Sequence, residues 1–311
     1  LAAGKDREAL RFLAWLLHAS RLDRPRLPAI FTLDGRPAPH ERDLVEWPGY
    51  GGSRPVRVGN GARTQHQLDG YGWVLDAAWQ LTRTGHRLDS ETWRTMRAFA
   101  GHVARTWMEP DAGVWERRDS PRHHVHSKLM AWLALDRAIR IAEQRGWASR
   151  RLTPWRGTLK ALGEEISGRG FDPGIGSYTA TYESEDLDAA LLLLPWIGFE
   201  PNDSPRVISS IQAIRNRLGA GGPLLYRYRG ADGLPGDEGA FLPCSFWLVQ
   251  ALAQIGRRAE AETLFEELLE YGGQLGLYGE EMDPSSHEHL GNFPQALTHS
   301  ALLQAATALN D

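Results

Sequence analysis

Hydrophobic residues recur along this chain with the spacing of amphipathic helices, at positions three and four apart. The pattern predicts helices at about residues 5–20, 67–84, 90–107, 124–145, 154–168, 185–198, 203–219, 244–256, 258–272 and 293–309. No segment shows the alternation of a convincing β-strand. The sequence therefore predicts an all-α protein.

Residues typical of helix ends support these boundaries. Ser90 is a candidate N-cap, and Pro205 stands in the first turn of its predicted helix. Four glycines occupy positions where a left-handed C-cap is expected; they are Gly85, Gly146, Gly168 and Gly273.

The predicted helices differ in polarity. Segments 185–198 and 244–256 are apolar nearly all round, which indicates inner helices, whereas their neighbours carry more charge. Long loops precede the inner helices, at 108–123, 169–184, 220–243 and 273–292, and such loops are often functional. Helical hairpins with long loops on one rim are typical of an α/α toroid. A repeat solenoid is the alternative, but no fixed repeat period is present.

Composition excludes several classes of protein. With 311 residues, of which 42% are hydrophobic and 24% charged, the chain can form a substantial core. A formal net charge of −4 with scattered basic residues does not favour nucleic acid or an anionic membrane as partner. The longest apolar run, near 191–194, is far shorter than the roughly 20 residues of a membrane span. Cys244 is the single cysteine, so no internal disulfide forms, and a cytoplasmic location is favoured.

Two of the long loops carry carboxylates that could perform acid–base chemistry. Glu116 lies in the first loop, after Trp115 and before Arg117 and Arg118, while Glu280 and Glu281 lie in the last. Cleavage of a glycosidic bond requires one carboxylic acid and one carboxylate. From spacing alone, however, a surface ion pair of Glu116 with an arginine and a solvated acidic turn at 280–281 are the more probable interpretations.

Three histidines, His123, His124 and His126, raise the question of a metal site. Their spacing argues against one, because no HExxH motif is present and a third ligand would have to come from elsewhere. The glycine-rich segments match neither a P-loop nor a dinucleotide fingerprint. We therefore expect neither metal nor cofactor.

Several longer motifs resemble the bacterial members of glycoside hydrolase family fifteen, the glucoamylase and trehalase-like family. The similarity covers nearly the whole chain. The matching segments are residues 52–60, 67–69, 109–116, 121–123, 126–138, 226–228, 233–241, 280–284 and 291–296.

The resemblance implies roles for individual residues. By the family's pattern Glu116 is the general acid and Glu280 the general base. Arg227 should hold sugar hydroxyls where the bond breaks. The other residues expected to line the pocket are Gln67, Asp69, Trp115, Arg118 and Glu281. The family inverts configuration, so the two catalytic carboxyls should lie about 6.5–9.5 Å apart.

The resemblance also implies a six-hairpin (α/α)6 toroid, whereas the ten predicted helices make about five hairpins. The N-terminal hairpin and an upstream β-sandwich have no counterpart in these 311 residues. We therefore expect residues 1–311 to be one toroid catalytic domain, the C-terminal part of a longer polypeptide. A second chain or an upstream segment would complete it.

The expected activity is that of an inverting, exo-acting α-glucoside hydrolase. It would release β-D-glucose from the non-reducing ends of malto- or isomalto-oligosaccharides. A trehalase of the same family is the first alternative. A non-catalytic carbohydrate-binding or regulatory domain is an alternative from another class, because fold does not fix function.

Overall fold

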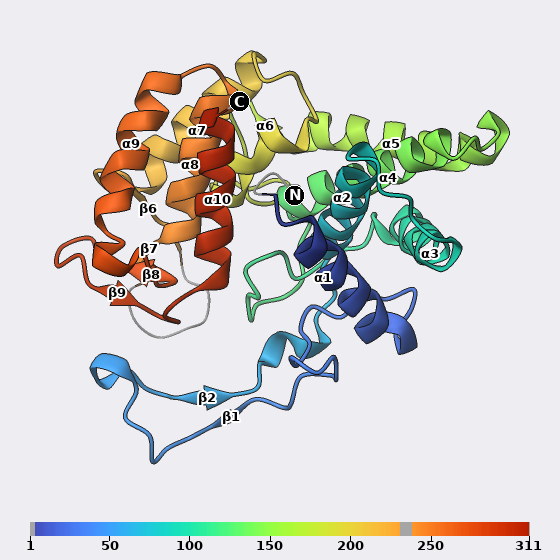
Figure 1. The fold of residues 1–311 in the computed structure, drawn as a ribbon. Helices are drawn as coiled ribbons and strands as arrows, with labels where there is room; N and C mark the ends of the chain where they lie inside the picture. The colour runs from blue at the N-terminus through green and yellow to red at the C-terminus, as the bar shows by residue number, and fades with distance from the viewer. Residues whose placement is uncertain (1–3, 231–237, 311) are drawn as a thin grey trace. The chain divides into compact units, whose positions relative to one another are not determined.

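The computed structural model describes residues 4–230 and 238–310, and helices predominate in them (Figure 1). The α-helices are α1 (Asp6–Ala19), α2 (Asp69–Arg83), α3 (Ser90–Thr106), α4 (Val125–Gln144), α5 (Ser149–Arg169), α6 (Leu194–Ile197), α7 (Pro205–Leu218), α8 (Leu242–Gln254), α9 (Arg258–Glu270) and α10 (Ala296–Asn310). The prediction of an all-α fold is confirmed.

Short β-strands, which the sequence did not predict, order the loops. They are β1 (Arg42–Asp43), β2 (Arg57–Val58), β3 (Phe171–Asp172), β4 (Ser177–Tyr178), β5 (Gly219–Gly221), β6 (Leu224–Leu225), β7 (Ala240–Phe241), β8 (Glu281–Met282) and β9 (His289–Leu290). All pairings are antiparallel, and β8 lies between β7 and β9. Pieces of two or three residues are too short to show a period of two, so no sequence pattern could predict them.

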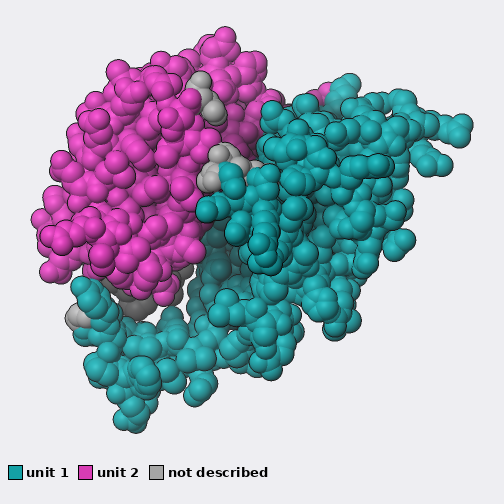
Figure 2. All heavy atoms as spheres, in the orientation of Figure 1, with its two compact units in different colours: residues 1, 3–123, 130–162 teal, residues 2, 124–129, 163–311 magenta. Residues whose placement is uncertain are grey.

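The chain divides into two compact units, shown in different colours in Figure 2. Unit 1 contains residues 4–123 and 130–162, and unit 2 contains residues 124–129 and the described part of 163–311. Two of the boundaries fall inside α4 and α5, and the third lies just before α4. That the 311 residues form one domain stays a prediction.

Within unit 1, α2 contributes much of the core. Tyr71, Leu75, Ala78 and Leu81 are almost completely buried, on the period expected of an inward helix face. Gly72 allows a close approach to α4, because a Cβ atom there would lie 2.7 Å from the backbone oxygen of Met130.

Within unit 2, α8 is the inner helix that its composition predicts. Every residue from Leu242 to Leu252 is buried, and α9 and α10 pack against α8. Helices that are apolar on all sides need such cover.

The prediction of one continuous α-helix at 185–198 is wrong. Residues Ala189–Leu193 make a 3₁₀ helix, and only Leu194–Ile197 are α-helical. The backbone before them is paired elsewhere, since Asp188 bridges Tyr228 and the N–H of Ala189 donates to the carbonyl of Arg227. Pro195 has no backbone N–H, so it fits the first turn of the short helix α6 but not the interior of one long helix over 185–198. The segment is buried as predicted.

Three smaller corrections concern helix ends. Asp89, not Ser90, caps α3, because its carboxylate accepts from the N–H groups of Glu91 and Thr92. Helix α5 starts five residues before the predicted Pro154 and continues through Gly168 to Arg169. The φ angles of Gly85, Gly146 and Gly273 are positive, as predicted, and Pro205 opens α7.

Candidate active site

Glu116 lies at the tip of a closed loop in unit 1. Asp111 and Arg122 exchange both backbone hydrogen bonds, each of 2.9 Å, and so join the two ends of the loop. Inside it, residues 113–116 form a turn in which Gly113 and Glu116 have φ angles of 71° and 54°. A left-handed conformation is unusual for a glutamate and costs on the order of 1–3 kcal/mol.

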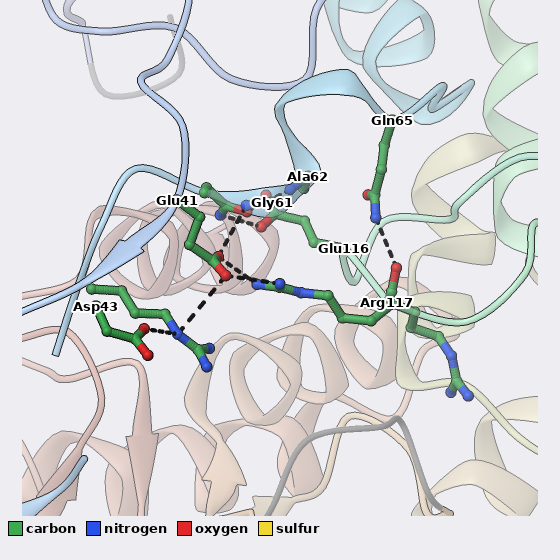
Figure 3. Close-up of polar contacts among 10 residues, drawn as sticks. Glu41, Asp43, Gly61, Ala62, Gln65, Glu116 and Arg117 are labelled. Carbon is green, nitrogen blue, oxygen red and sulfur yellow. Dashed lines mark hydrogen bonds and ion pairs between the residues drawn. The ribbon is translucent and has the colours of Figure 1, made fainter. Parts of the chain in front are cut away.

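An asparagine holds the Glu116 carboxyl. Nδ2 of Asn60 donates to Oε2 of Glu116 at 2.7 Å, and Oδ1 of Asn60 accepts from the N–H of Ala62 at 2.8 Å. Figure 3 shows Glu41 beside Gly61, whose N–H donates to Oε2 of Glu41 at 3.0 Å.

Arg118 pairs with Glu41. Its guanidinium donates to both carboxylate oxygens, at 2.9 and 2.6 Å, and Glu41 also accepts from the N–H of Gly61. The hydrogen bond from Arg118 is the main reason that the pKa of Glu41 falls to about 2. A Cβ atom on Gly61 would lie 2.8 Å from Nη1 of Arg118, so the small residue makes room for the guanidinium. The role predicted for Arg118 in sugar binding stays a prediction.

The polar side chains before α2 belong to the same loop system. Gln67 donates to the Gln65 amide oxygen at 3.2 Å, and Gln65 donates to the carbonyl of Arg117 at 2.7 Å, as Figure 3 shows for Gln65. Trp115 is half-buried. Within unit 1, Gln67 and Trp115 therefore lie in the same loop region as Glu116.

Asp69 is the most perturbed acid of unit 1. It is 6% exposed, and its Oδ1 has no hydrogen-bond partner among the described residues. Burial, and then the negative charge of the fully buried Asp111, raise the pKa of Asp69 to about 7. Such a buried acid with a free oxygen is suited to contact a sugar hydroxyl.

Glu280 lies in unit 2, directly before β8. Its Oε2 accepts from Nδ2 of Asn292 at 2.9 Å and from the N–H of Asn292 at 3.2 Å. Gly291 makes room for this carboxylate, since a Cβ atom there would lie 2.9 Å from Oε2. Glu280 is thus held by Asn292, which lies just after β9.

Glu281 is the first residue of β8. The side chains of successive residues in extended backbone point to opposite faces. Glu280 and Glu281 therefore contact different residues. The Oε2 of Glu281 accepts from the N–H of Gly239 at 3.1 Å. Burial, and then the charge of Glu238, raise the pKa of Glu281 to about 7, although Arg227 opposes the shift.

Arg227 is bound to Glu238, to which its Nε donates at 2.8 Å. Its guanidinium carbon lies 5.0 Å from the ring centre of Tyr228 and 5.4 Å from that of Phe241. Burial lowers the pKa of Arg227, but the hydrogen bond and charge of Glu238, together with Tyr228 and Glu281, outweigh it. The pKa is therefore raised, and the side chain stays charged. The guanidinium of Arg227 is thus fixed in position by an acid and by aromatic rings.

The structure thus brings Gln67, Trp115, Glu116 and Arg118 to one loop system of unit 1. In unit 2, Arg227 and Glu281 share the surroundings of Glu238. The segment 233–237 of the family-like motif lies outside the described residues. In the described parts of the chain, no group of three or more His, Cys, Asp or Glu side chains is arranged to hold a metal ion, and no helix is long and apolar enough to cross a membrane.

Sequence reasoning gave no role to four residues that contact the predicted site: Glu41, Asn60, Glu238 and Asn292. Asn60, Glu238 and Asn292 lie inside the family-like motifs. Their position next to glycines and acidic residues in these motifs was the available signal. That position does not show which site residue each of them contacts.

Comparison with known proteins identifies the class of this chain. The model of the glycosyl hydrolases family 15 matches residues 1–307. The chain belongs to this family.

Trehalases are among its similar relatives. The trehalase of Mycobacterium tuberculosis is 40% identical over 308 residues, which are 97% of this chain and 45% of that protein. The trehalase of Thermoplasma acidophilum is 36% identical, over 99% of this chain and 52% of its own. The chain spans about half the length of the curated relatives it matches.

A solved structure confirms the fold class. A bacterial glucoamylase in complex with acarbose superposes with a TM-score of 0.75 at 14% identity, over 99% of this chain and 47% of that one. The fold is therefore that of the glucoamylase (α/α) toroids, as expected.

Proposed function

We propose that the protein containing this chain is an inverting trehalase, which hydrolyses α,α-trehalose to two glucose molecules. The observation that supports this substrate is the 40% identity to a trehalase over nearly the whole chain. It favours trehalose over the malto- and isomalto-oligosaccharides that we expected first.

The reaction requires a proton donor and a base, and we assign Glu116 and Glu280 to these roles. Glu116 would donate its proton to the oxygen between the two sugars as the bond from that oxygen to the anomeric carbon breaks. Glu280 would take a proton from water, whose oxygen forms the new bond to the anomeric carbon from the opposite face. The predicted separation of the carboxyls, about 6.5–9.5 Å, leaves room for this water.

The remaining site residues would bind the sugar. Asp69, with a free and buried oxygen, and Arg227, with its charge held by Glu238, are the strongest candidates for hydroxyl contacts. For Gln67, Trp115, Arg118 and Glu281 the same role rests on the family pattern. We also propose that an upstream segment or a second chain supplies the rest of the pocket, and that the protein works in the cytoplasm, which the single cysteine Cys244 favours.

The test is to incubate the complete protein with trehalose, maltose and isomaltose, and to follow the fresh product by NMR. Inverting cleavage of trehalose yields one β-glucose and one α-glucose, so both anomers should appear at equal initial rates. Two α-glucose molecules would contradict inversion. Faster cleavage of maltose or isomaltose than of trehalose would favour the glucoamylase-like alternative.

Variants test the two carboxyls. Glu116→Gln and Glu280→Gln should each lower the rate on trehalose by roughly a hundredfold or more, since acid–base assistance contributes about that much. Activity near that of the parent protein in either variant would refute the mechanism. Sugar binding without turnover in the parent would instead support a carbohydrate-binding or regulatory role.

A further inference from the structure

We infer that Asn60 is a positioning residue that decides which oxygen of Glu116 carries the transferred proton. This inference rests on the proposed function of Glu116 as general acid. It goes beyond that function because it names the oxygen atom and the residue that selects it.

The orientation of the Asn60 amide is fixed on its oxygen side. Asn60 is the N-cap of the 3₁₀ helix Gly61–Thr64, and its Oδ1 accepts the N–H of Ala62 at 2.8 Å. An N-cap requires an acceptor at this point, so the amide nitrogen must face the other way. The nitrogen donates to Oε2 of Glu116 at 2.7 Å.

This donor distinguishes the two oxygens of Glu116. A neutral carboxyl has one carbonyl oxygen and one hydroxyl, and the carbonyl oxygen is the better acceptor. With Oε2 accepting from Asn60, the proton is placed on Oε1. Among the described residues Oε1 makes no hydrogen bond, which leaves its proton free for a leaving group.

The loop backbone fixes the point from which the Glu116 side chain starts. Glu116 stands in a left-handed conformation at the tip of a loop whose ends are joined by the Asp111–Arg122 pair. A half-turn about the last side-chain bond would bring the protonated oxygen against the Nδ2 donor of Asn60, where it is the poorer acceptor. Such fixing of a reacting group before reaction lowers the barrier to transfer.

Asn292 offers an internal comparison. It donates twice to Oε2 of Glu280, through Nδ2 and through its backbone N–H. Glu280 acts on water rather than on the leaving group. Loss of Asn292 should therefore disturb a step that every substrate shares, whereas loss of Asn60 should disturb only leaving-group protonation.

The experiment compares two substrates in the complete protein. Trehalose has a poor leaving group that needs a proton, while α-glucosyl fluoride releases fluoride, which needs little acid assistance. The variant Asn60→Asp keeps an acceptor for Ala62 but lacks the N–H donor for Glu116. We expect its kcat/KM on trehalose to fall roughly tenfold or more further than on the fluoride. Activity on the fluoride also shows that the variant is folded.

Two further variants identify what fails if the result differs. Asn292→Ala should lower kcat/KM on both substrates by similar factors. Glu116→Gln should separate the two substrates even more strongly than Asn60→Asp. If Glu116→Gln separates them and Asn60→Asp does not, the positioning role is wrong while the proposed function stands. If Glu116→Gln leaves the rate on trehalose unchanged, the proposed function itself is wrong.

Discussion

Asp69 shows at the scale of one residue how a proposed binding position can reduce stability. Its carboxyl is buried, one oxygen has no partner among the described residues, and its pKa rises from 3.8 to about 7. The folded protein holds this proton more tightly than the unfolded chain does. The contribution of the protonated Asp69 to the free energy of unfolding is therefore complete below about pH 4. It is lost as the pH rises through 7.

Replacement of Asp69 by asparagine, which resembles the neutral acid, should remove this pH dependence. We expect Asp69→Asn to gain stability relative to the parent as the pH rises from about 4 to 8, by at most roughly 4 kcal/mol, since one pKa unit corresponds to about 1.4 kcal/mol. Urea unfolding at several pH values measures this.

Asp89→Asn is the matched control. The N–H of Thr92 and the other α3 cap contacts lower the pKa of Asp89, so the parent loses that stabilisation as the pH falls. Relative to the parent, Asp89→Asn should therefore lose stability as the pH rises, opposite to Asp69→Asn. Equal pH slopes for the two variants would contradict this account of Asp69.

The site residues also show what a sequence can reveal. Glu116 and Glu280 stood out only through family motifs, because spacing alone favours surface roles. Asn60 lies 56 residues before Glu116, and no local pattern connects residues at that distance. The hydrogen-bond partners of Glu116 and Glu280 could be identified only from the folded structure.

At the scale of elements, hydrophobic period predicted the long helices well. The predicted bounds are correct to within about three residues for α2, α3, α4, α7, α8 and α9. Most of these helices bury one apolar face, and α8 is buried on all sides. The segment 185–198 failed because backbone pairing with Arg227 and Tyr228 outweighs local preference. Hydrophobic periodicity shows which residues are buried. It cannot show that the backbone of one segment pairs with a segment distant in the sequence.

The close packing of α2 on α4 leads to a prediction about Gly72. Gly72→Ala would place a methyl group 2.7 Å from the Met130 carbonyl oxygen and 2.9 Å from its Cε atom. We expect a loss of about 1–3 kcal/mol, because backbone has to move. Thermal or urea unfolding measures it.

Gly157 of α5 is the control for this variant. A Cβ atom at Gly157 meets nothing within 4 Å, so Gly157→Ala should gain up to about 1 kcal/mol from reduced chain entropy. Stabilisation of both variants would show that α2 and α4 do not pack tightly at this point.

For the whole molecule, charge makes a prediction about the substrate. The formal net charge of the 311 residues is only −4, and trehalose, the proposed substrate, is neutral. Encounter therefore gains little from electrostatic attraction, and screening should matter little. We expect KM for trehalose to change less than about twofold between roughly 0.05 and 0.5 M salt. A tenfold rise in KM over this range would contradict this prediction.

The backbone of Glu116 has a consequence for the history of this family. A left-handed residue suits glycine or asparagine, and glutamate is kept there against the preference of the chain. A duplicated gene that no longer needs the reaction gains stability by losing this side chain, so mutation would remove it early. On the proposed role of Glu116 as general acid, selection for turnover is what maintains glutamate at this turn. Its absence from a homologous sequence would then mark a copy that has taken up another task.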